Sequence, residues 1–247
     1  MAMLEARDIH VRFGDRVVLE DISLAVEPGE FHGIMGPNGA GKTTFFNVLT
    51  GRVRPSRGTV RIGGEDVTGL SPHAIAARGV ARSFQIMTLF DEFTARENVE
   101  VALPEFRARG FDGRRAAVGD PAFAAAARAV LAEVGLAEKA ETVAKDLPYG
   151  DRRALEIAVA LAQRPRVLCL DEPTSGLGLD GVTRLAALVA GLKGRLSIVA
   201  VEHDMEFLFG LADRISVIHW GQVVAHGLPA ELRANPWVRR SNLGRLQ

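Results

Sequence analysis

A glycine-rich segment near the N-terminus combines the residue types that bind phosphate groups. Residues 36–44 read GPNGAGKTT, which contains the spacing G-x-x-x-x-G-K-[ST]. Glycines let backbone N–H groups turn inward around phosphate oxygens, and a helix predicted from Lys42 adds positive potential at its N-terminus. We expect Lys42 to reach the β- and γ-phosphates of a nucleotide and the Thr43 hydroxyl to bind Mg²⁺. The expected nucleotide-binding residues of this segment are Gly36, Pro37, Asn38, Gly39, Ala40, Gly41, Lys42, Thr43 and Thr44.

An alternative is that the segment is only a tight turn before a helix. Because only four of the thirty basic residues are lysines, that alternative leaves Lys42 unexplained. A compact ammonium in an arginine-rich chain indicates a need for a point charge.

Two carboxylates follow a second apolar run at 167–170. At the carboxyl end of a parallel strand, Asp171 is expected to face bound Mg²⁺. Glu172 is expected to point elsewhere and to act as the base toward an attacking water. Alone, two acidic residues could simply end a strand at the surface, but beside a complete phosphate loop the functional interpretation is favoured. Cys169, inside the run, is interpreted as a small core residue and not as a nucleophile.

The elements that must hold these groups alternate between strands and helices. Extended runs are predicted at 4–11, 16–19, 22–26, 31–35, 59–62, 167–170, 197–201, 215–219 and 222–225. Helices are predicted at 42–50, 71–79, 120–134, 181–192, 205–211 and 229–234. The stretch from about 94 to 162 is helical and alanine-rich, with a polar loop at 107–119. Buried strands that alternate with helices predict an α/β fold with a mostly parallel sheet, here interrupted by a helical insertion.

Composition excludes several classes of protein. Among 247 residues, 47% are apolar, and thirty basic residues balance thirty acidic ones, which argues against a nucleic-acid partner. A single cysteine excludes an internal disulfide and fits a reducing compartment. Glu5 and Asp8 stand where a signal peptide needs an apolar run, and no stretch of 18 apolar residues exists. We therefore expect a soluble cytoplasmic protein.

Further motifs complete a resemblance to a known family. Together with the phosphate loop and the acidic pair, the segments Phe84-Gln85, LPYGD at 147–151 and VEHD at 201–204 resemble the ATP-binding subunit of ABC transporters. The segments RSFQIMTLFDEFTARENV and EHDMEF are similar to those of the branch that imports branched-chain (hydrophobic) amino acids. The resemblance implies a P-loop NTPase with a RecA-like parallel-sheet core, an antiparallel β subdomain and an inserted α-helical subdomain. It places the core and β subdomain at 1–93 and 163–247, and the helical subdomain at 94–162.

The resemblance also implies roles for single residues. Phe13 would stack on adenine, although a core phenylalanine is the alternative. Gln85 would sense Mg²⁺ and the attacking water, and His203 would contact the γ-phosphate. Tyr149 and Gly150 would direct backbone amides to ATP bound by a partner protomer. The catalytic set is thus Glu172, His203, Gln85 and Lys42, and the metal ligands are Thr43, Gln85 and Asp171.

Three positions depart from the common family pattern. In the signature segment, Pro148 removes a serine hydroxyl and Asp151 replaces a glutamine. Gly178 stands where many members have Asp or Asn. We expect a weakened phosphate contact at this segment and not an inactive site.

The resemblance finally implies partners and a place in the cell. We expect ATP, Mg²⁺, transmembrane permease subunits, a second ATPase subunit (a copy of this chain or a sister ATPase) and, indirectly, an extracytoplasmic substrate-binding protein. The chain would lie peripherally on the cytoplasmic side of the inner membrane and power import of branched-chain amino acids or related small metabolites. A permease helix would dock near Gln85, or else the apolar side chains there pack locally: Ile86, Met87, Leu89, Phe90 and Phe93. Open alternatives are a lipid or lipopolysaccharide exporter ATPase, a soluble ABC protein that acts on DNA or ribosomes, and a regulatory module without turnover.

Overall fold

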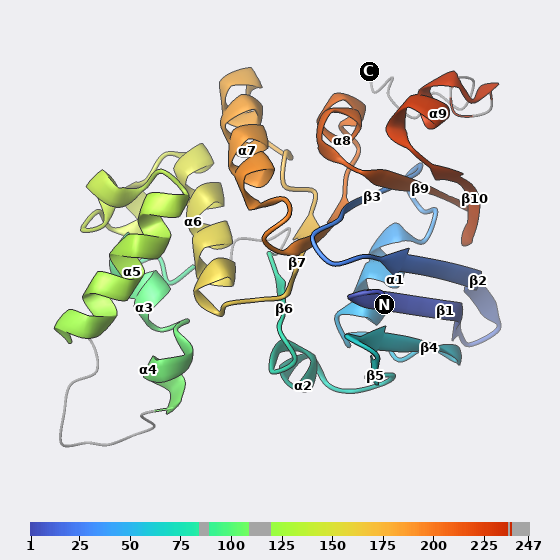
Figure 1. The fold of residues 1–247 in the computed structure, drawn as a ribbon, viewed down its shortest axis with the longest axis horizontal. Coiled ribbons are helices and arrows are strands. Elements are labelled where there is room, and N and C mark those ends of the chain that lie inside the picture. The colour runs from blue at the N-terminus through green and yellow to red at the C-terminus, as the bar shows by residue number, and fades with distance from the viewer. Residues whose placement is uncertain (84–88, 109–119, 237, 239–247) are drawn as a thin grey trace.

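A mostly parallel sheet forms the centre of the molecule (Figure 1). The computed structural model describes residues 1–83, 89–108, 120–236 and 238. Its larger sheet has the strand order β10-β9-β3-β8-β7-β6, in which the β9–β10 pair is antiparallel and the other pairs are parallel. These strands are β3 (Phe31–Met35), β6 (Val80–Arg82), β7 (Val167–Asp171), β8 (Ser197–Val201), β9 (Arg214–His219) and β10 (Gln222–Gly227). The predicted fold class is confirmed. The three-residue strand β6 was not among the predicted runs.

A second, antiparallel sheet lies beside the first and has the order β2-β1-β4-β5. Its strands are β1 (Leu4–Phe13), β2 (Arg16–Val26), β4 (Arg57–Ile62) and β5 (Glu65–Asp66). The sequence predicts two separate runs at 16–19 and 22–26, but β2 is continuous. Asp21 lies between them with φ 58°, and the β1–β2 register shifts nearby, so the break in the pattern is an irregularity within one strand.

Helices cover the sheets, and several begin or end at predicted residues, whereas α2 ends at Ala76 and not near Gly79, and α7 begins at Leu179, two residues before the predicted start. Asp120 caps α5 through its side chain, Thr94 caps α3 in a capping box, and Gly51 ends α1 with φ 74°. The described helices are α1 (Lys42–Leu49), α2 (Pro72–Ala76), α3 (Ala95–Glu100), α4 (Pro104–Ala108), α5 (Pro121–Glu133), α6 (Tyr149–Ala162), α7 (Leu179–Leu192), α8 (Met205–Leu211) and α9 (Pro229–Ala234).

Helices α3 to α6 gather at one end of the molecule, away from the antiparallel sheet (Figure 1). This group falls within the 94–162 segment, and its division from the rest as a subdomain stays a prediction. None of the helices in the described part of the chain combines the length and the apolar character needed to cross a membrane.

The central sheet has a core on both faces because successive side chains of a strand point to opposite sides. Leu168 and Leu170 of β7 pack in an apolar cluster that extends into α3, α5 and α6. Val167 and Cys169 pack in a second cluster that extends into α1 and the antiparallel sheet. Strand β7 is therefore buried on both faces. Side chains can contribute to a site at its carboxyl end, where the strand stops.

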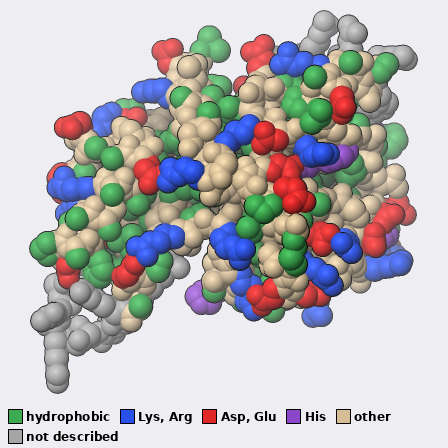
Figure 2. Space-filling view, in the orientation of Figure 1, with side chains coloured by type: hydrophobic (Ala, Val, Ile, Leu, Met, Phe, Trp, Pro, Cys, Tyr) green, Lys and Arg blue, Asp and Glu red, His purple; other side chains and the backbone are tan. Residues whose placement is uncertain are grey.

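The surface carries charges of both signs. Acidic and basic side chains are interspersed over the face shown in Figure 2, as the balanced composition implies.

We expect Cys169 to be chemically inert in the folded protein. Its side chain is fully buried, and burial raises the pKa of its thiol to about 12, so the nucleophilic thiolate is scarce at pH 8. Iodoacetamide at pH 8 should leave the folded chain unmodified and add one carbamidomethyl group in denaturing guanidinium chloride, as measured by intact mass. Rapid labelling of the folded chain would show that the strand opens easily.

Candidate functional site

The phosphate loop connects β3 to α1 and is held tightly by neighbouring backbone. A Cβ at Gly36 would lie 2.0 Å from the carbonyl oxygen of Ile218, so β9 leaves room for glycine alone. Gly41 has φ 103°, a left-handed conformation that other residues rarely adopt, and it immediately precedes α1. The glycines at these two positions are thus required by close packing and by the turn into the helix.

Lys42 reaches back across this loop. Its Nζ donates to the carbonyl oxygens of Gly36 and Pro37 at 2.8 and 2.9 Å, and the residue is 6% exposed. Burial lowers the pKa of Lys42, and the negative charges of Glu172 and Asp171 oppose that shift. The ammonium is therefore held by carbonyl oxygens of the loop, in the electrostatic field of Asp171 and Glu172.

A cavity of about 330 Å³ brings several of the predicted residues together, whereas Gly36, Pro37, Asp171, Tyr149 and Gly150 are not among the residues that line it. It is lined by Phe13, Arg16, Val18, Asn38, Gly39, Ala40, Gly41, Lys42, Thr43, Thr44, Glu172 and His203. Phe13, at the end of β1, is 55% exposed, which excludes its interpretation as a core residue. The cavity thus has an aromatic ring from one sheet, the phosphate loop in the middle, and a carboxylate and an imidazole from the other sheet.

Glu172 and His203 meet at hydrogen-bond distance. His203 Nε2 lies 3.1 Å from Glu172 Oε1, and both side chains are partly exposed. The two residues follow β7 and β8, whose carboxyl ends lie side by side with Asp171 opposite Val201. Glu172 has φ 46°, a left-handed conformation, at the point where the chain leaves β7. The sequence assigned these residues separate tasks, and the structure makes them a pair.

Asp171 is held by a residue that the sequence analysis missed. Arg82 Nη2 donates to Asp171 Oδ2 at 2.6 Å, and both side chains are almost fully buried. Arg82 Nη1 also donates to Asn47 Oδ1 at 2.7 Å and to Thr50 Oγ1 at 3.0 Å. One arginine among 26 gives no signal in the sequence. In the structure it joins β6, β7 and α1.

The oxygen groups predicted to bind a metal are compatible with Mg²⁺. Thr43 presents an exposed hydroxyl in the cavity, and Asp171 supplies a carboxylate at the adjacent strand end. Hydroxyl and carboxylate oxygens are the ligands that Mg²⁺ prefers. Gln85, the third predicted ligand, lies outside the described residues, as do Ile86 and Met87.

The signature segment at 147–151 leads into α6. Pro148 immediately precedes the helix, and Tyr149 and Gly150 open it, where backbone N–H groups have no partner within the helix. The Tyr149 hydroxyl donates to the carbonyl oxygen of Ser175 at 3.1 Å, in the loop that follows the acidic pair. Asp151, in place of the family's glutamine, is buried in an ion pair with Lys139.

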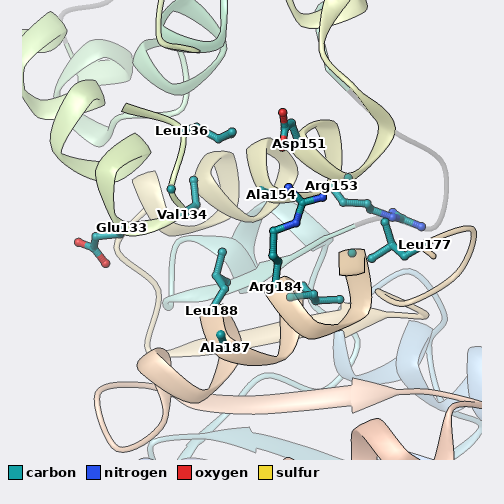
Figure 3. Close-up of a pocket in the computed structure, with 14 residues that line it drawn as sticks. Glu133, Val134, Leu136, Asp151, Arg153, Ala154, Leu177, Arg184, Ala187 and Leu188 are labelled. Carbon is teal, nitrogen blue, oxygen red and sulfur yellow. The ribbon is translucent and has the colours of Figure 1, made fainter. Parts of the chain in front are cut away.

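A second cavity of about 330 Å³ lies behind the signature segment, between α5, α6 and α7. Figure 3 shows Leu136, Leu188 and Leu177 around it, with the Arg184 side chain extending from α7 toward α6. The lining of this cavity combines apolar side chains with charged ones, and Asp151 is among the charged residues.

Of the apolar residues predicted to follow Gln85 at a docking surface, the structure describes Leu89, Phe90 and Phe93. Leu89 packs against the core, whereas Phe90 is 57% exposed and stacks on Phe93 with ring centroids 5.1 Å apart. Local core packing therefore accounts for Leu89, but it does not account for Phe90.

Comparisons with known proteins identify relatives over nearly the whole chain. The family model described as ABC transporter matches residues 19–175. The chain is 39% identical over 251 residues to the high-affinity branched-chain amino acid transport ATP-binding protein BraF of Pseudomonas aeruginosa, covering 98% of each. It is also 39% identical over 252 residues to LivG of Salmonella typhimurium, a protein of the same description, again covering 98% of each. Identity to the lipopolysaccharide export system ATP-binding protein LptB of Acidithiobacillus ferridurans is lower, at 32%, over 98% of this chain and 97% of that protein.

Solved structures agree with these relatives. The structure of an ATP-binding cassette of an ABC transporter in its ADP conformation superposes with a TM-score of 0.88 at 25% identity. The superposition covers 99% of this chain and all of the other.

Replacing Arg82 should destabilise the fold strongly. Arg82→Met leaves the buried carboxylate of Asp171 without its counter-charge, and breaking a buried pair in this way costs about 3–5 kcal/mol of unfolding free energy. Arg78→Met removes the exposed pair with Glu65 and should cost less than about 1 kcal/mol. Urea denaturation of both variants measures the difference. Equal losses would contradict the importance assigned to the Arg82–Asp171 pair.

Proposed function

The chain belongs to the ABC transporter family, and we propose that it is the ATP-hydrolysing subunit that powers import of branched-chain amino acids or related small metabolites. The observation that carries this proposal is the cavity that places Phe13, the phosphate loop, Glu172 and His203 around one space. The chain is 39% identical to two ATP-binding proteins of branched-chain amino acid transport and 32% identical to LptB of lipopolysaccharide export. This difference in sequence identity favours amino-acid import over lipopolysaccharide export.

ATP would bind in this cavity with its adenine at one end and its phosphates at the other. The exposed ring of Phe13 would stack on adenine at one end, while the N–H groups of the phosphate loop would surround the phosphates. Lys42 would exchange its hydrogen bonds to Gly36 and Pro37 for the β- and γ-phosphates. The γ-phosphate would then lie nearest to Glu172 and His203.

Mg²⁺ would be held by Thr43, Asp171 and Gln85. When bound, it neutralises charge on the phosphate oxygens and holds them in place. Arg82, which donates to Asp171 Oδ2, would hold this carboxylate in place beside the metal.

Hydrolysis would proceed by in-line attack of water on the γ-phosphorus. Glu172 would orient this water and accept its proton, and His203 would hold the Glu172 carboxylate and contact the γ-phosphate. Positioning and charge stabilisation provide the acceleration in reactions of this class.

A second ATPase subunit would complete each site. The amides of Tyr149 and Gly150, at the start of α6, would cap the γ-phosphate bound by the partner, and Pro148 offers no hydroxyl to help them. Two chains, or this chain and a sister ATPase, would therefore close around two ATP molecules. Closure and reopening would drive the permease.

The remaining partners are proposed from the same family. Permease subunits would receive the exposed Phe90 region, and an extracytoplasmic substrate-binding protein would deliver the amino acid to them. The chain would then lie peripherally on the cytoplasmic face of the inner membrane.

Glu172→Gln should separate ATP binding from ATP hydrolysis. The amide keeps the shape and hydrogen bonding of the carboxylate but is not a base, so turnover should fall about 10²–10⁴-fold. ATP should still bind by calorimetry, and trapped ATP should produce a dimer detectable by light scattering.

Lys42→Ala is the matched control, because it should weaken Mg-ATP binding while circular dichroism remains unchanged. Near-normal hydrolysis by Glu172→Gln would show that the water is activated elsewhere. Unchanged ATP affinity of Lys42→Ala would place the nucleotide outside this cavity.

Phe90→Asp should disturb assembly with the permease more than ATP binding. A charge in an apolar contact is costly to bury. Val224→Asp, at an exposed site on the edge strand β10, is the control. The measurement is recovery of membrane subunits that co-purify with each variant, followed by their identification by mass spectrometry. Full recovery with Phe90→Asp would exclude Phe90 from the docking surface, and exporter subunits would overturn the import proposal.

A further inference from the structure

Glu202 is a buried carboxylate at the carboxyl end of β8. It is 2% exposed and follows Val201, the last residue of the strand. Its backbone N–H donates to the carbonyl oxygen of Ile34 in β3, which fixes the residue against the neighbouring strand. Within the described residues no basic side chain pairs with it, so its charge must be compensated in another way.

Three backbone N–H groups provide that compensation. Thr174 N donates to Glu202 Oε1 at 2.7 Å. His203 N and Asp204 N donate to Oε2 at 2.8 and 3.2 Å. Hydrogen bonds of this kind, with a charged acceptor, are stronger than neutral ones.

These donors come from two different loops. Thr174 lies two residues after Glu172, in the loop that leaves β7, whereas His203 and Asp204 lie in the loop that leaves β8. A single carboxylate therefore joins the two loops whose side chains meet in the Glu172–His203 contact. Since that contact spans 3.1 Å, its geometry depends on the separation of the two loops.

We propose that Glu202 is a positioning residue that keeps Glu172 and His203 at the separation needed for hydrolysis. The inference rests on the proposed ATPase function and adds a residue to its machinery. A carboxylate can accept hydrogen bonds at both of its oxygen atoms, whereas the amide of glutamine accepts at one. A glutamine at this site would turn its carbonyl oxygen toward the two donors of the β8 loop, and its NH₂ group would face Thr174 N–H. The loop that follows β7 would then lose the hydrogen bond from Thr174 N to residue 202.

The test compares two buried glutamates. Glu202→Gln should lower kcat at least about tenfold, because displacements near 1 Å at a reacting centre cost up to about 10²-fold, while the ATP dissociation constant stays within about twofold. Glu100→Gln is the control, since Glu100 is fully buried in α3, pairs with Arg96 and lies outside the site. It should lower the melting temperature without changing kcat below that temperature.

A double-variant cycle shows whether Glu202 acts through His203. In a His203→Ala background, Glu202→Gln should change kcat less than about twofold, because residues that act as a unit have non-additive effects. Glu202→Asp, which keeps the charge on a shorter side chain, should give an intermediate kcat. It also serves as the test variant if Glu202→Gln does not fold.

Amide hydrogen exchange provides a measurement that does not need turnover. The Thr174 amide should exchange at least about tenfold faster in the Glu202 variant than in the wild type, and Glu100→Gln should leave it unchanged. Unchanged Thr174 exchange, or faster exchange with an unchanged kcat, would overturn the inference. A wild-type chain without ATP hydrolysis would instead overturn the proposed function, and the exchange result would still decide whether Glu202 ties the loops.

Discussion

Parallel pairing of β3, β7 and β8 is the constraint on which the site depends. Pairing in this register brings the carboxyl ends of the three strands to one edge, with Met35, Asp171 and Val201 as their last residues. Each strand is buried on both faces, so the polar side chains that follow it can reach solvent only at that edge. The phosphate loop, the acidic pair and His203 are therefore neighbours although about 170 residues of chain separate the first from the last.

Where polar groups at this edge of the sheet are buried, each requires a partner. Lys42 donates to two carbonyl oxygens, Arg82 neutralises Asp171, and Glu202 accepts three N–H groups. Buried charges without such partners would cost several kcal/mol each. Each of these hydrogen bonds thus has two effects: it stabilises the fold, and it orients a side chain of the site.

The sequence predicted the elements well because their signals are local. Helix caps such as Asp120, turn glycines and buried apolar runs each act within a few residues. Phe13, Glu172 and His203 were found through motifs, and the structure brings them to one cavity. Arg82 and Asp171 are 89 residues apart, and no local pattern links them. The same reason hid the Tyr149–Ser175 contact. The continuity of β2 was missed for a local reason, because the irregularity at Asp21 interrupts the alternating pattern without ending the strand.

The Tyr149 hydroxyl has a consequence for how two subunits could work together. It grips the loop that starts at Glu172, yet it belongs to the segment proposed to face the other subunit's nucleotide. A movement of α6 would therefore pull on the chain's own hydrolytic loop. In a closed pair of subunits, this hydroxyl would therefore connect a contact across the interface with the position of the hydrolytic loop in its own chain.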